Sequence, residues 1–179
     1  SETIKENYNV TMLNPLSQDL SVLRQSMLFS GLEAIEYNSN RKNSDLKLFE
    51  FGKTYHNFPG GRTETKHLSL FITGLKTEGN WVSPETKSNF FFGKGTVAAL
   101  MERLGLEGFT EDSTDNDIFA EGISLKRNKE KIVEFGIVKQ KVTKELDVDA
   151  EIFFADFNWD AVLKQISTKN FKLKPIAKF

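Results

Sequence analysis

The chain of 179 residues contains no cysteine, so no disulfide can hold its fold together. A chain of this length can bury roughly 70% of the surface that its unfolded form exposes, so a hydrophobic core suffices. The lack of cysteine is compatible with a reducing compartment, and we expect a cytoplasmic protein.

A strong charge of either sign is also missing, because 24 Lys and Arg residues face 25 Asp and Glu residues. A net charge of -1 creates no global field that would attract nucleic acid or an acidic membrane. Apolar runs are only a few residues long, far below the roughly 20 residues that cross a bilayer, and the N-terminus has no signal-peptide core. We therefore expect a soluble protein with no membrane partner.

Alternating stretches predict an antiparallel pair of strands in the first half. Residues 46–55, LKLFEFGKTY, place Phe49 and Phe51 on one face, and because both faces are largely apolar we expect this strand to be covered on both sides. Residues 59–61 form a turn, and residues 67–76 are the returning strand.

The stretch before this pair predicts an amphipathic helix that Ser17 or Asp19 caps. Its apolar residues recur at helical spacing: Leu20, Leu23, Met27, Leu28, Gly31 and Ile35. Arg24 falls inside this apolar arc, so it needs a partner, and Glu50 is a carboxylate on an apolar strand face. We predict that Arg24 and Glu50 meet.

Val22 and Phe29 lie opposite the main stripe of that predicted helix, so both of its faces carry apolar groups. Two interpretations stay open at this point. The second face contacts another chain, or a second layer of the same domain covers it.

The second half continues with single helices between strands. We predict helices at about residues 95–104 and 160–166, and strands in three segments, residues 118–126, 131–140 and 151–157. Residues 1–179 are thus predicted to form one α+β domain, an antiparallel β-sheet flanked by helices.

Residue chemistry alone reveals no catalytic, cofactor-binding or metal site. The GKGT stretch at residues 93–96 lacks the spacing of a phosphate-binding loop. His56 and His67 have neither a cysteine nor an acidic cluster close by in sequence, and Ser26 and Ser30 lack the setting of a nucleophile elbow.

A family resemblance is more informative. Residues 14–55, which begin NPLSQDLSVLRQSMLFSGL and end LKLFEFGKTY, resemble the beta chain of bacterial phenylalanine–tRNA synthetase. The likeness continues through HLSLFITG, NFFFGKGTVAALMERLGL and FFADFNWDAVL. It implies a class II aminoacyl-tRNA synthetase-like core, excised from a longer beta chain. It also implies an α2β2 assembly in which the alpha chain binds ATP and phenylalanine, magnesium takes part, and tRNA binds the whole complex.

The resemblance further implies that this fragment is catalytically silent and holds no cofactor itself. In a working class II site, as the resemblance implies, an Arg follows a strand that ends in glycine. In this chain His56 stands at that place. A second Arg is required after the last strand, where this chain brings Asn158, Trp159 and Asp160, and no Arg occurs in residues 128–179. Loss of both phosphate-binding charges predicts a structural domain that supports the alpha chain in charging tRNA with phenylalanine.

Two alternatives remain at this stage. One is a stand-alone class II-like paralogue that acts as a small-ligand-binding module. The other is a direct tRNA-binding module that uses the polar-basic loop at residues 41–47, although the balanced overall charge argues against it.

Overall fold

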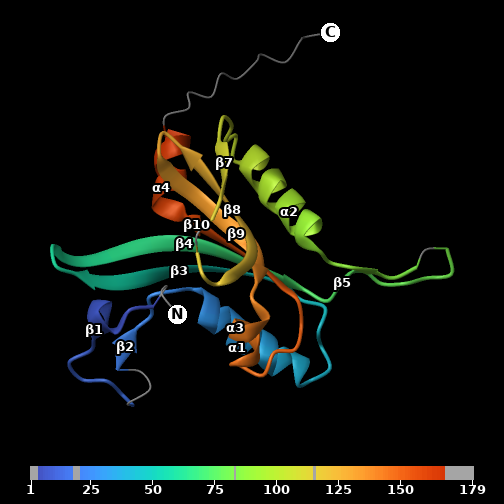
Figure 1. The fold of residues 1–179 in the computed structure, drawn as a ribbon, viewed down its shortest axis with the longest axis horizontal. Coiled ribbons are helices and arrows are strands. Elements are labelled where there is room, and N and C mark those ends of the chain that lie inside the picture. Colours follow the sequence, from blue (N-terminus) through green and yellow to red (C-terminus); the bar gives the residue numbers. More distant parts are fainter. Residues whose placement is uncertain (1–3, 18–20, 83, 115, 168–179) are drawn as a thin grey trace, which may run out of the picture.

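The computed structural model describes residues 4–17, 21–82, 84–114 and 116–167 (Figure 1). An antiparallel sheet of six strands, in the order β3-β4-β10-β9-β8-β7, is its central element. The strands are β3 (Lys47–Phe58), β4 (Gly61–Thr73), β7 (Thr110–Ser113), β8 (Phe119–Arg127), β9 (Glu130–Val138) and β10 (Ile152–Asn158). The α+β class with an antiparallel sheet is therefore confirmed.

Helices and short strands surround this sheet. The helical elements are η1 (Glu6–Tyr8), α1 (Leu28–Ser39), α2 (Phe90–Arg103), α3 (Gln140–Lys144) and α4 (Trp159–Ser167). Two small sheets pair β1 (Val10–Thr11) with β2 (Val22–Leu23) and β5 (Leu75–Thr77) with β6 (Thr86–Lys87). Figure 1 shows β5 at the base of an arm that projects from the body beside α2.

One face of the sheet packs against α2 and α4. Its core joins Val97 and Met101 of α2 and Val162 of α4 to strand residues such as Phe153 and Phe157. Gly93 is essential to this contact, because a Cβ at this position would collide with the ring of Phe153. The helix can approach β10 closely only where it carries no side chain.

The opposite face has an apolar core at one end only. There α1 contributes Leu28, Leu32 and Ile35 to a second core that includes Phe71 and Phe154 of the sheet. Alternation along β10 puts Asp156 on the same face as Phe154 but two residues further from α1. Polar side chains gather on the other half of this face.

The predicted hairpin is confirmed in its pairing and its turn. Strands β3 and β4 pair from Lys47 and Ile72 to Phe58 and Gly61, with a turn at residues 59 and 60. The expectation that β3 is covered on both sides is wrong, because one face of this edge strand is open to solvent at Phe49 and Phe51. Phe49 and Phe51 are 70% and 56% exposed.

The first helix also differs from its prediction. It begins at Leu28, after Met27 at the cap position, whereas Val22 and Leu23 pair with Thr11 and Val10 in the first small sheet. The capping residue Asp19 and the apolar residue Leu20 lie outside the described residues. Arg24 and Val22 are therefore not helical, and the opposite-face argument that joined Val22 to Phe29 is wrong.

The second helix was predicted to begin at about residue 95, and it begins at Phe90. The side chain of Asn89 caps it by accepting a hydrogen bond from the backbone N–H of Phe92. The GKGT stretch thus lies inside the helix, where its N–H groups form helical hydrogen bonds. In the part of the chain that the structure describes, no helix is long and apolar enough to cross a membrane.

Candidate functional site

A row of polar residues crosses the half of this face that α1 does not cover, one residue from each strand. In strand order these residues are Glu50, Ser69, Asp156, Glu134, Ser124 and Asp112, each directly opposite the next. Ser69, Ser124 and Glu134 are buried. We call this set the polar row.

Asp156 is the centre of one hydrogen-bond network in the polar row. Its carboxylate lies 2.9 Å from Nδ1 of His67 and accepts a hydrogen bond of 2.8 Å from the hydroxyl of Ser69. The other ring nitrogen of His67 lies 2.8 Å from the hydroxyl of Thr54, which is buried. The imidazole is thus held between two strands, with both nitrogens engaged.

Glu134 is the centre of a second network. It accepts hydrogen bonds of 2.7 Å from the hydroxyl of Thr114 and from Nζ of Lys131, and a further one from the amide of Asn116. Burial alone raises the pKa of this carboxyl, but Lys131, Thr114 and Asn116 together outweigh it and lower the pKa below its ordinary value of 4.5. Glu134 is therefore ionised at neutral pH.

Arg24 and Glu50 form a third network, and their predicted contact is present. Nη1 of Arg24 donates to Oε1 of Glu50 over 2.7 Å, while Nε donates to the carbonyl of Lys53. The hydroxyl of Ser30 lies 3.3 Å from Nη1 of Arg24 and from Oε2 of Glu50, and so joins the two. Gly52 makes room for Arg24, because a Cβ there would collide with the guanidinium.

The premise behind that prediction is wrong. Arg24 precedes α1 instead of lying in its apolar arc, and the side chains of Arg24 and Glu50 are 36% and 37% exposed. An ion pair of this exposure contributes about 0–1 kcal/mol to stability, much less than a buried pair. Its effect is to orient the guanidinium and to occupy the Glu50 carboxylate.

The polar row leaves its carboxylates little capacity for a ligand. Each has a basic partner: Arg24 for Glu50, His67 for Asp156, Lys131 for Glu134 and Lys126 for Asp112. Two hollows over the row, of about 230 and 290 Å³, share Lys131 and Glu134 in their walls. Both lie below the roughly 300–1,000 Å³ that is typical of small-molecule pockets.

His56, at the place where the resemblance expects an Arg, carries little charge. It lies on β3 opposite Thr63, and its ring stacks on that of Phe58 with centroids 5.3 Å apart. Burial, and then the neighbouring His67, lower the pKa of His56 below 6.5. A neutral imidazole at pH 7 cannot replace the permanent charge and the bidentate geometry of a guanidinium.

The residues that stand in place of the second Arg all make contacts within the domain. Asn158 accepts a hydrogen bond from the backbone N–H of Ala161 in the first turn of α4. Asp160 accepts one from the backbone N–H of Lys66 on β4. Trp159 packs edge-on against Phe51, with ring centroids 4.9 Å apart. None of the three offers a positive charge.

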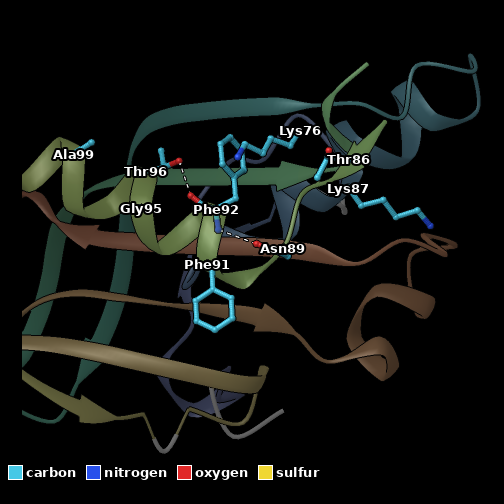
Figure 2. A pocket seen from close by; sticks show the side chains of 9 residues that line it. All are labelled: Lys76, Thr86, Lys87, Asn89, Phe91, Phe92, Gly95, Thr96 and Ala99. Atoms are coloured by element: carbon cyan, nitrogen blue, oxygen red, sulfur yellow. Dashed lines mark hydrogen bonds between the residues drawn. The ribbon is translucent and has the colours of Figure 1, made fainter. Parts of the chain in front are cut away.

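A larger hollow of about 630 Å³ lies at the start of α2, away from the polar row (Figure 2). Figure 2 shows two of its polar groups bonded to the helix: Asn89 accepts from the N–H of Phe92, and the hydroxyl of Thr96 donates to the carbonyl of Phe92. Nζ of Lys76 lies 5.3 Å from the centre of the Phe92 ring. The backbone groups around the GKGT stretch are not free to cradle phosphate.

Sequence reasoning missed the networks around Asp156 and Glu134. A signal was present, because FFADF and KIVEFG each carry one carboxylate inside an otherwise apolar strand. A lone carboxylate inside a strand needs hydrogen-bond donors around it. The register of β9 and β10 places Glu134 directly opposite Asp156, so the two carboxylates lie side by side. Thr54 and Ser69 carried no such signal, since hydroxyl groups are common in strands.

Acid should weaken the fold through Glu134. Because its folded pKa is depressed, its ionised form contributes stability at pH values above 4.5, and that contribution is lost as the pH falls below 4.5 through the folded pKa. Urea unfolding of residues 1–179 at about pH 7 and about pH 3.5 should show a smaller loss of stability on acidification for Glu134→Gln than for the unaltered chain. Glu111→Gln, in an exposed pair with Lys94, is the control, and its acid response should match the unaltered chain.

The sheet and the helices around it correspond to a known architecture. Two solved structures of pyrrolysyl-tRNA synthetase from Desulfitobacterium hafniense superpose on 89% and 90% of this chain, and on 57% and 56% of theirs. The TM-scores are 0.62 and 0.64, at sequence identities of 11% and 12%. The domain therefore has the fold of a class II-like aminoacyl-tRNA synthetase core.

The particular family follows from sequence similarity. The family described as the phenylalanyl tRNA synthetase beta chain CLM domain matches residues 2–159. The chain belongs to this family, and the resemblance read from its sequence is confirmed.

Curated relatives carry the same family name. The phenylalanine–tRNA ligase beta subunit of Bacteroides thetaiotaomicron is 37% identical over 99% of this chain, and that of Porphyromonas gingivalis is 31% identical over 95%. The beta subunit of Thermotoga maritima is 28% identical over 95%. The alignments cover only 23%, 22% and 21% of these relatives, so the chain spans less than a quarter of their length.

Proposed function

We propose that residues 1–179 form one non-catalytic core domain of a phenylalanine–tRNA synthetase beta subunit. In this role the domain supports an alpha chain, within an α2β2 assembly, in the ATP-dependent charging of tRNA with phenylalanine. The beta-subunit relatives support the assignment to the complex, and the polar row supports the absence of catalysis. The complex would act in the cytoplasm.

The proposal rests on one observation: the cationic groups that would bind substrate are either absent or already bonded to other side chains of the domain. A class II-like site must hold the phosphates of ATP, which requires free cationic donors. At the two places where the resemblance expects Arg, the chain has a half-buried, neutral His56 and the Asp160 carboxylate. Arg24, the guanidinium next to the polar row, is already engaged by Glu50.

ATP and magnesium, which the parent complex would use, do not fit the polar row. A magnesium ion binds carboxylate oxygens, but Glu50, Asp156 and Glu134 already bond to Arg24, His67 and Lys131. Metal binding would have to displace these donors. Among the described residues, no group of three or more His, Asp or Glu side chains is placed to hold a metal ion. We therefore place both cofactors in the parent complex, outside residues 1–179.

A stand-alone paralogue that binds a small ligand is the alternative. Two hollows over the polar row, of about 230 and 290 Å³, offer it a site there, but the carboxylates in their walls, Asp156 and Glu134, already bond to His67 and Lys131. A direct tRNA-binding module has less support, because the guanidinium of Arg41 packs 3.4 Å from the centre of the Tyr37 ring instead of projecting freely.

Val22 and Phe29 remain candidates for the contact with the alpha chain. Phe29 packs partly against the core of its own domain, whereas Val22 on β2 is exposed, so Val22 is the better probe. In the full-length subunit, Val22→Asp should weaken association with the alpha chain by about tenfold or more, because an interface buries an unpaired charge at high cost.

The control for this substitution is Val82→Asp, on the projecting arm, where the valine is also exposed. Affinities from biolayer interferometry should be unchanged for Val82→Asp. Equal affinities of both variants and the unaltered subunit would remove Val22 from the interface.

A further inference from the structure

An aromatic strip lies uncovered along β3, on the face of the sheet that α2 and α4 cover elsewhere. Phe49 and Phe51 are its centre, with ring centroids 6.4 Å apart, and Trp159 packs edge-on against Phe51. Leu163, one turn further along α4 on the same helix face as Trp159, is 44% exposed. Exposed aromatic side chains at adjacent same-face positions of a strand mark a surface that packs against something.

The backbone next to the strip is also open. Leu46 and Thr73 exchange both of their backbone hydrogen bonds, so even-numbered residues of β3 bond toward β4 and odd-numbered residues face outward. The N–H and C=O groups of Phe49 and Phe51 therefore point to the outer edge. Among the residues that the structure describes, no backbone partner meets them there.

The next part of the same edge is already occupied. The N–H of Tyr55 donates to the carbonyl of Arg24, and the Arg24 side chain donates to the carbonyl of Lys53. A segment of this chain thus covers the edge at Lys53 and Tyr55 and leaves it open at Phe49 and Phe51. Open edges next to exposed aromatic residues promote aggregation, and folded proteins usually cover them.

The size of the strip indicates where its occupant comes from. Two aromatic residues and one leucine offer roughly 300 Å², well below the roughly 800 Å² per partner of a stable complex between separate chains. A segment of the same polypeptide needs no such area, because its covalent link supplies a high effective concentration. The relatives have more than three quarters of their length outside the part that aligns with this chain.

From these observations we infer that an extended segment of the full-length beta subunit, from outside residues 1–179, adds to β3 as a further strand at Phe49 and Phe51. Its backbone bonds to the outward groups of these two residues, and its alternate apolar side chains pack on the aromatic strip. The inference rests on the proposed function only in that the chain is part of a longer beta subunit.

Amide hydrogen exchange at single-residue resolution, on the full-length subunit as purified with its alpha chain, tests this arrangement. The inward amides of Leu48 and Glu50 bond to β4 and serve as internal references. The outward amides of Phe49 and Phe51 should be protected on the order of 100-fold relative to an unstructured peptide. Fast exchange of the outward pair beside a protected inward pair would overturn the inference.

The source of the strand is tested by a photo-crosslinking amino acid at Phe49, with the same substitution at Phe91 as the control. Phe91 is an exposed aromatic residue on α2, away from the strip. The expected product joins residue 49 to a beta-subunit peptide outside residues 1–179. In a mixture of isotope-labelled and unlabelled subunits, it should join peptides of one label only. Crosslinks to the alpha chain, or between differently labelled beta subunits, would overturn the inference.

Charging of tRNA by the same preparation separates this inference from the proposed function. An active complex with unprotected outward amides would refute the added strand and leave the proposed function intact. If no complex with an alpha chain forms, the proposed function fails, and the exchange measurement on the full-length chain alone still decides whether β3 is covered.

Discussion

Replacing Phe157 by alanine should lower the free energy of unfolding of residues 1–179 by about 3–5 kcal/mol. The side chain is fully buried between the sheet and the helices α2 and α4, in the core that contains Val97 and Val162. Neighbouring strands hold the surroundings in place, since Phe157 lies opposite Leu68 on β4 and Val133 on β9. The cavity left by the ring can therefore collapse only partly.

Phe91→Ala is the matched control, because the same ring is removed from a site that is 77% exposed. Its effect should stay within about 0.5 kcal/mol, as is usual for surface substitutions. Urea denaturation of both variants, followed by circular dichroism, measures the difference. Equal stabilities of the two variants would contradict the packing of α2 and α4 on this face of the sheet.

Replacing Asp156 by alanine should cost about 2–4 kcal/mol of folding free energy. The change removes the acceptor of Ser69, which is fully buried, and the partner of His67, so two donors lose their bonds at once. Each unsatisfied buried polar group costs about 1–3 kcal/mol. Glu111→Ala, which breaks an exposed pair with Lys94, should cost about 0–1 kcal/mol.

The Asp156 result also separates the two functional hypotheses. If the polar row is a structural network, Asp156→Ala destabilises the domain and Asp156→Asn, which keeps one acceptor oxygen, recovers part of the loss. If the polar row is a ligand site of a stand-alone paralogue, the carboxylate should be dispensable for stability. Thermal unfolding of both variants decides, and an unchanged midpoint for Asp156→Ala would contradict the structural interpretation.

Much of the sheet was predictable because its signals are local. Alternation and turn residues predicted the β3–β4 hairpin, and the pair β8 and β9 around residues 128 and 129 follows from the same kind of pattern. Coverage of β3 was not predictable, because apolar residues on both faces of a strand do not reveal how far the helices of the fold extend over it. The strand order depends on β10, which is distant in sequence.

Helix boundaries failed for physical reasons that differ between the two helices. Val22 and Leu23 have helical spacing to later apolar residues. They nevertheless form a strand, because their pairing with β1 outweighs this local preference. In α2, three consecutive phenylalanines and two glycines disfavour a helix locally. Asn89 caps the helix and the buried face of Val97 and Met101 stabilises it.

The candidate site was only partly visible in the sequence. The contact between Arg24 and Glu50 was predicted correctly, although from a helix that does not include Arg24. The pair of His67 and Asp156 could not be predicted, because the two residues are separated by 89 positions and meet only through the register of β4 and β10.

Pyrophosphate exchange by the folded fragment tests the central claim, that this domain has the synthetase fold without its chemistry. Residues 1–179 would be supplied with phenylalanine, ATP, magnesium and labelled pyrophosphate, after circular dichroism has shown a cooperative unfolding transition. We predict no phenylalanine-dependent exchange above the blank, while the complex of the full-length beta subunit with its alpha chain exchanges readily. Robust phenylalanine-dependent exchange by the fragment alone would contradict the account.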